Sequence, residues 1–188
     1  MIPVAARRAL AALALVLLPT AATVGVAQQA PPGLQADLAR DIAGLAQKYV
    51  DLAGALPAEA MDWRPMDGVR SGAEVFCHVA GANYRIPGYF GIEAPAGAEE
   101  VDAACAAEDA SALKAALPEA LAASFAFAGT AVTSVENARL DDGTKLFGRD
   151  TTVRAAMLLY VTHMHEHLGQ LVAYARSNGV VPPWSAGG

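Results

Sequence analysis

The sequence predicts an all-α protein that folds as a four-helix bundle. Four segments have the length of bundle helices and carry apolar residues three or four positions apart, a spacing that places them on one face of a helix. No segment shows the sustained apolar and polar alternation of a half-buried strand. Helix caps and helix-breaking residues separate the four segments, as the connections of a bundle require.

The first helix is expected over residues 34–56, and Pro57 ends it. Its apolar positions follow the helical spacing: Leu34, Leu38, Ile42, Leu45, Tyr49 and Leu52. The connection over residues 57–70 holds turn residues and one large aromatic side chain, Trp63. We expect this indole to pack under the bundle.

The second helix is expected to begin after Ser71 and to run to about residue 86. Ser71 is a favourable N-cap, and Glu74 follows three residues later, which is the spacing of a capping box. Pro87-Gly88 then breaks the helical pattern. Residues 94–107 are rich in alanine, glycine and acidic residues, so we expect them to form a connection.

The third helix is expected to begin near residues 109–111. Its apolar residues are Leu113, Leu117, Leu121, Phe125, Phe127 and Val132. Pro118 either kinks this helix or marks the first turn of a new one, and the sequence leaves both alternatives open. Residues 140–150 contain turn-forming Asp and Gly residues and are expected to form a loop with at most a short hairpin.

The fourth helix is expected to be capped by Thr151 or Thr152, to continue to Asn178 and to stop at Gly179. It contains three of the four histidines of the chain within five positions. The helix therefore concentrates the side chains that most readily bind a transition metal.

His163 and His167 are four residues apart, a rotation of about 400°, so both imidazoles lie on one helix face. His78, in the second helix, could complete a site of three histidines, which with one open position is typical of catalytic zinc. The alternative is a pair of hydrogen-bonded histidines at the margin of the bundle. His165 lies on the other side of the helix and is interpreted as a packing or interface residue.

One short motif suggests a secreted metallopeptidase. Residues 163–167 match H-x-x-E-H, in which Glu166 would be the catalytic base. Such a peptidase needs an acidic ligand well downstream, but none of the 21 residues after His167 is Asp or Glu. The peptidase interpretation is therefore disfavoured.

Two longer stretches resemble the DinB-like superfamily. The last helix of the family is resembled by His163-x-x-x-His167-Leu-Gly-Gln170, followed by Tyr174-x-Arg176 and Gly179-x-x-Pro182-Pro183. The second helix of the family is resembled by Trp63-Arg-Pro65, followed by Ser71-x-x-Glu74-x-x-x-His78-Val-Ala-x-x-Asn83. The resemblance covers about residues 34–185. It implies a four-helix bundle of the DinB-like type with His78, His163 and His167 as metal ligands.

The resemblance implies one divalent metal ion, most often zinc or nickel, and in some members a thiol-dependent S-transferase or hydrolase activity. Such an enzyme would act on a small electrophile whose identity the sequence does not give. Glu166 and Glu74 are weak candidates for a catalytic proton acceptor. Asn83, Gln170 and Tyr160 are expected to orient ligands or substrate. The alternative is a metal-binding or interaction module of the cell envelope without catalysis.

Residues 1–27 have the order of a secretory signal peptide. Arg7 and Arg8 give a positive start, residues 9–18 form an apolar stretch too short to span a bilayer, and small residues precede a cleavage point after Ala27. We therefore expect an exported protein, periplasmic or secreted. Residues 28–33 would form a short linker and residues 34–185 a single bundle domain.

The charge and composition of the chain limit the classes of partner that we expect. The whole chain of 188 residues has a net charge of −6, and loss of the two signal arginines lowers the basic count from 13 to 11 against 19 acids, a net charge of −8. We expect no nucleic-acid partner, because phosphate binding needs a basic patch, and no membrane span after signal removal. A homodimer is left open. Cys77 and Cys105 form either a disulfide or two free thiols.

We predict that the mature chain begins near Gln28, with a cut after Ala22 as the alternative. Mass spectrometry of protein recovered from the periplasm or the medium reads this terminus directly. Intact Met1 on a soluble cytosolic protein would refute both the signal peptide and the assigned compartment.

Overall fold

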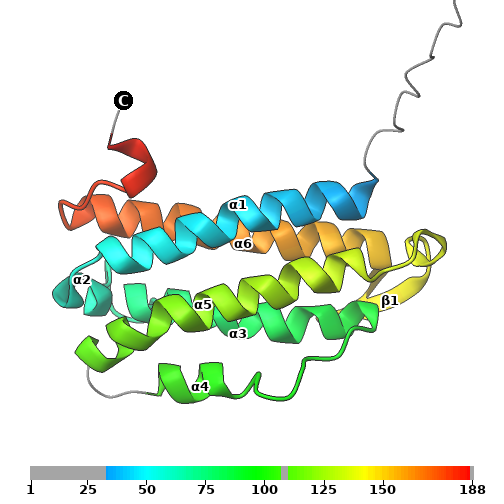
Figure 1. The fold of residues 1–188 in the computed structure, drawn as a ribbon, viewed down its shortest axis with the longest axis horizontal. Coiled ribbons are helices and arrows are strands. Elements are labelled where there is room, and N and C mark those ends of the chain that lie inside the picture. Colours follow the sequence, from blue (N-terminus) through cyan, green and yellow to red (C-terminus); the bar gives the residue numbers. More distant parts are fainter. Residues whose placement is uncertain (1–32, 107–109, 187–188) are drawn as a thin grey trace, which may run out of the picture. The chain divides into compact units, whose positions relative to one another are not determined.

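The computed structural model describes residues 33–106 and 110–186, which build a bundle of four long helices (Figure 1). These helices are α1 (Leu34–Ala55), α3 (Gly72–Arg85), α5 (Ala110–Thr133) and α6 (Val153–Ser177). Both α1 and α3 pack against α5 and α6, so the four helices surround one core. The predicted all-α class is confirmed. The predicted signal peptide lies outside the described residues.

The helices do not simply alternate in direction. Figure 1 shows α1 and α6 running one way and α3 and α5 the other. Because α3 and α5 are parallel, the chain must cross the length of the bundle between them. The crossover contains the 3-10 helix η1 (Ile86–Phe90) and the short helix α4 (Glu100–Cys105). The sequence predicted only a connection here, and α4, whose Val101 is buried, is a correction to it.

The helix ends follow the predicted capping. Ser71 Oγ accepts a hydrogen bond from the Glu74 amide at 3.3 Å, and Glu74 Oε2 accepts one from the Ser71 amide at 2.6 Å, which completes the capping box. Thr152 caps α6 by accepting from the Ala155 amide. Between α1 and α3, the structure adds a short helix that the sequence did not predict, α2 (Ala58–Asp62). Trp63 then packs edge-on against Tyr174, with ring centroids 5.2 Å apart.

Pro118 lies inside α5, nine positions into a helix that continues to Thr133. It therefore does not open a new helix, which removes one of the two alternatives. By length and composition, the segment Ser111–Thr133 could cross a membrane, which the sequence analysis did not anticipate. In the bundle this helix is a core element, because Leu117 and Leu121 are fully buried against α1 and α3.

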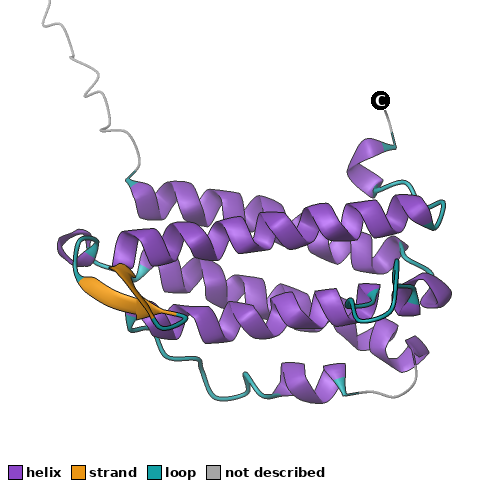
Figure 2. Ribbon diagram, turned by 180° about the vertical axis from the view of Figure 1, so that it is seen from behind, coloured by secondary structure: helices purple, strands orange, loops and turns teal. Residues whose placement is uncertain are grey.

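A two-stranded antiparallel hairpin joins α5 to α6, within the loop where the sequence allowed one. Its strands are β1 (Gly143–Leu146) and β2 (Arg149–Thr152), and Figure 2 shows them at one end of the bundle. The turn consists of Phe147 at φ 49° and Gly148 at φ 79°, the positive φ values that a two-residue hairpin turn requires. Further 3-10 turns are η2 (Asn137–Arg139) and η3 (Pro183–Ser185).

Two buried tyrosines connect α6 to its neighbours. Tyr49 of α1 donates to the Met164 carbonyl at 2.6 Å, and Tyr160 of α6 donates to the Asn83 carbonyl of α3 at 2.7 Å. Burial raises the pKa of both phenols, because it disfavours the phenolate. Each hydroxyl therefore stays a donor and fixes one helix against another.

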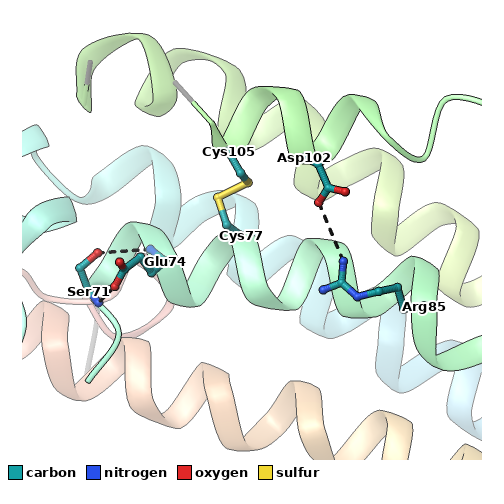
Figure 3. The surroundings of a disulfide bond; sticks show 6 residues. All are labelled: Ser71, Glu74, Cys77, Arg85, Asp102 and Cys105. Carbon is teal, nitrogen blue, oxygen red and sulfur yellow. Dashed lines mark hydrogen bonds and ion pairs between the residues drawn. A yellow bond between two sulfur atoms is a disulfide. The ribbon is translucent and has the colours of Figure 1, made fainter. Parts of the chain in front are cut away.

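A disulfide between Cys77 and Cys105 joins α3 to α4 (Figure 3). Of the two states that the sequence left open, a disulfide or two free thiols, the structure has the disulfide. The bond anchors the crossover to the helix that carries His78. Arg85 and Asp102 form a second link at 3.9 Å between the same elements, but both side chains are exposed, so this ion pair contributes little.

We predict that replacing both cysteines by serine lowers the free energy of unfolding by about 3 kcal/mol, because the bond closes a loop in the unfolded chain. Urea unfolding of the two proteins measures the difference. Wild-type protein should yield two alkylated thiols only after reduction. Two thiols that react without reductant would show that the bond is absent.

Candidate metal centre

Three histidines converge between α3 and α6. Ligand nitrogens of His78, His163 and His167 all lie within 4.8 Å of one another, and the three side chains are half-buried. Nε2 of His78 is 3.1 Å from Nε2 of His163. Two imidazole nitrogens on one tetrahedral zinc ion are about 3.3 Å apart, given zinc–nitrogen distances of about 2.0–2.1 Å. The observed separation therefore suits a shared metal ion.

The local structure explains this convergence. The four-residue spacing on α6 puts the His163 and His167 rings 4.5 Å apart. Packing of α3 against α6 then brings the His78 ring within 5.1 Å of His163 and 4.8 Å of His167. The cluster therefore results from one turn of α6 and from the packing of α3 against that turn.

A chain of hydrogen bonds orients His167. Its Nδ1 is 2.9 Å from Gln170 Oε1, and because an amide oxygen only accepts, Nδ1 carries the proton and Nε2 is left with a lone pair for a metal. Gln170 Nε2 donates to the Tyr174 hydroxyl at 2.8 Å, and this hydroxyl donates to the Arg70 carbonyl at 3.2 Å. Gln170 thus contacts one of the three histidines and is itself held by Tyr174.

The electrostatics favour neutral imidazoles, which are the form that binds metal. Burial lowers the pKa of His78 to about 4, and the nearby positive charge of Arg70 adds to this effect. Burial also lowers the pKa of His163 to about 4, with further contributions from His167 and His78. Nδ1 of His163 is buried without a hydrogen-bond partner among the described residues, so this ring is held by packing and by its Nε2 contact.

The two candidate proton acceptors lie elsewhere. Glu166 is exposed on α6 and is not part of the cluster. Glu74 takes part in the capping box and forms an ion pair with Arg64 at 3.3 Å. The hydrogen bond that it accepts from the Ser71 backbone amide is the main cause that lowers its pKa. His165 is exposed and pairs with Asp41 of α1 at 2.8 Å, so it links two helices at the surface. In the described part of the chain, the cluster therefore has no carboxylate of its own.

Asn83 and Tyr160 hold helices together and make no hydrogen bond to the imidazoles among the described residues. Asn83 is buried, and its side-chain amide donates to the Ser124 hydroxyl of α5 at 3.1 Å. Its backbone carbonyl accepts the hydrogen bond from the Tyr160 hydroxyl. The side-chain oxygen of Asn83 has no partner within the part of the chain described. Both residues therefore position α3 against its neighbours.

Sequence reasoning missed a cleft next to the cluster. It has a volume of about 710 Å³ and is lined by Arg64, Gly68, Val69, Arg70, Glu74 and Gln170. Gln170 lines this cleft and also holds His167, so the two sites adjoin. The sequence holds one signal for this cleft, the pair of arginines in the connection before Ser71.

Comparisons with known proteins agree with the fold and with the motifs. No curated protein matches the chain. The solved structure of a DinB-like protein, YjoA of Bacillus subtilis, is similar with a TM-score of 0.52 at 19% identity, over 76% of this chain and 92% of that one. At this identity the similarity concerns the fold alone. The model of the DinB superfamily matches residues 42–171, and the chain therefore belongs to the DinB superfamily.

Proposed function

We propose that this protein is an exported member of the superfamily that binds one divalent metal ion, zinc or nickel, through His78, His163 and His167. The observation that carries the proposal is the convergence of three half-buried imidazoles within 4.8 Å. The donor set fits such an ion, because imidazole nitrogen suits both metals and neutral rings are ready to bind.

Three protein ligands leave a coordination position for water or a small ligand. An ion in this site would lower the pKa of a bound water or thiol and polarise a small electrophile, which is the chemistry of a hydrolase or an S-transferase. Gln170 fixes the tautomer and the orientation of His167. Tyr174 in turn holds Gln170 in place.

Export receives support from the disulfide. Bonds such as Cys77–Cys105 persist in oxidising compartments and are rare in the cytosol. The signal-like order of residues 1–27 points to the same compartment. A cytosolic thiol cosubstrate fits this location poorly. The proposed nucleophile is therefore either a metal-activated water or a thiol.

One observation favours a second candidate, a metal-binding module without catalysis. Among the described residues, neither Glu74 nor Glu166 lies in the histidine cluster, and Glu74 is already engaged by Ser71 and Arg64. General acid–base catalysis needs a group within hydrogen-bond reach of the reacting atoms. The two candidates differ in whether the open position exchanges ligands.

We predict that wild-type protein retains one metal ion per chain and that His78→Ala, His163→Ala and His167→Ala each lose most of it, because two nitrogens hold an ion far less tightly than three. Elemental analysis after dialysis measures the stoichiometry. His165→Ala is the matched control on the same helix and should keep the ion. Full metal content in His78→Ala would disprove the site of three histidines.

We further predict that the cobalt-substituted protein changes its d–d spectrum when a small thiol or hydroxamate is added, because the added molecule occupies the open position. Absorption titration gives the affinity. The response should disappear in His163→Ala and His167→Ala. A spectrum that no added ligand alters would decide for the module without catalysis.

A further inference from the structure

The cleft beside the histidines carries one unmatched positive charge. Two arginines and one glutamate line it. Arg64 is paired with Glu74 at 3.3 Å and also donates to the Val69 carbonyl at 3.0 Å, so these two opposite charges balance. In the parts of the chain that the structure describes, no carboxylate lies within ion-pairing distance of the Arg70 guanidinium.

The backbone of Arg70 is linked to the histidine cluster, and Arg70 lines the same cleft as Gln170. Its backbone carbonyl is held by Tyr174, which bonds Gln170 and through it reaches His167. The backbone that presents this guanidinium is thus fixed relative to the imidazole cluster, while the side chain itself stays exposed and free to bind.

Arg149 and Arg176 also have no ion pair among the described residues, but of these three arginines only Arg70 lines the cleft beside the histidines. Arginine binds planar anions through two parallel hydrogen bonds, and carboxylate is the anion that fits this geometry. Glu74 opposes such a ligand less than a lone carboxylate would, because it is paired with Arg64 and accepts a hydrogen bond from the Ser71 amide.

We propose that Arg70 is the anchor of a subsite for carboxylate-bearing small molecules, and that the reactive end of such a molecule reaches the histidine cluster. This inference rests on the proposed metal function for the role of the reactive end. It adds the substrate class: small acids, in preference to neutral compounds of the same size. Arg70 would position the substrate and would not itself take part in bond making.

The experiment compares two thiols that differ in charge, 3-mercaptopropionate and 2-mercaptoethanol, on the cobalt-loaded protein. Wild-type protein should bind the acid about tenfold more tightly than the neutral thiol, the advantage expected for one charge-assisted contact. Arg70→Gln should lose this preference and keep its affinity for 2-mercaptoethanol. Arg70→Lys, which keeps the charge without the planar fork, should retain only part of it.

Arg149→Gln is the matched control, because Arg149 is an exposed arginine of β2, and Figure 1 shows the hairpin at the opposite end of the bundle from α2. It should behave as wild type. Equal affinity of wild-type protein for the two thiols, or an unchanged preference in Arg70→Gln, would overturn the subsite.

A second measurement does not depend on the metal. Propionate should shift the side-chain Nε–H resonance of Arg70 in nitrogen-15 spectra of the metal-free protein, and the Arg149 resonance should not move. If thiols fail to alter the cobalt spectrum but propionate shifts Arg70, the proposed open coordination position fails and the anion subsite stands. If the Arg70 resonance does not respond to propionate, the subsite is wrong whatever the cobalt spectrum shows.

Discussion

The two buried phenols fix the position of α6, and the rest of the site depends on them. A hydroxyl group without access to water has to form its hydrogen bond inside the protein, since an unsatisfied buried donor destabilises the fold. Tyr49 bonds the carbonyl of Met164, the residue next to His163, and Tyr160 bonds the carbonyl of Asn83 in α3. These bonds set the register at which α6 meets α1 and α3. With another register, His78 would not face His163 and His167.

The parts of the fold that the sequence predicted are those in which local and long-range preferences agree. The core positions of α1, from Leu38 to Leu52, repeat at helical spacing and are buried, and Ser71 caps α3 as its spacing to Glu74 predicts. The two short helices were missed because α2 and α4 have only five and six residues. Helices of this length are not stable on sequence preference alone, and the burial of Val101 and the link through Cys105 hold α4 in place.

The site was predictable to a similar degree. Helical geometry alone pairs His163 with His167. His78 is a candidate because it is the remaining histidine of the chain and lies in another predicted helix, and the resemblance to the family adds to this, but only the packing of α3 against α6 shows that it faces them. The cleft could not be predicted, since an exposed arginine in a turn looks like any solvated charge. Only the tertiary structure reveals that Glu74 pairs with Arg64 and leaves Arg70 without a counterion among the described residues.

The hydrogen-bond chain from His167 through Gln170 and Tyr174 to the Arg70 carbonyl has a thermodynamic consequence. It joins a helix to the turn that precedes another helix, so neither end can move without breaking a bond of the chain. Any ligand that orders one end reduces the conformational entropy that remains to be lost at the other. Occupancy of the proposed cleft subsite and of the proposed metal site would therefore be coupled, and the coupling free energy would be the same in whichever order the two are filled.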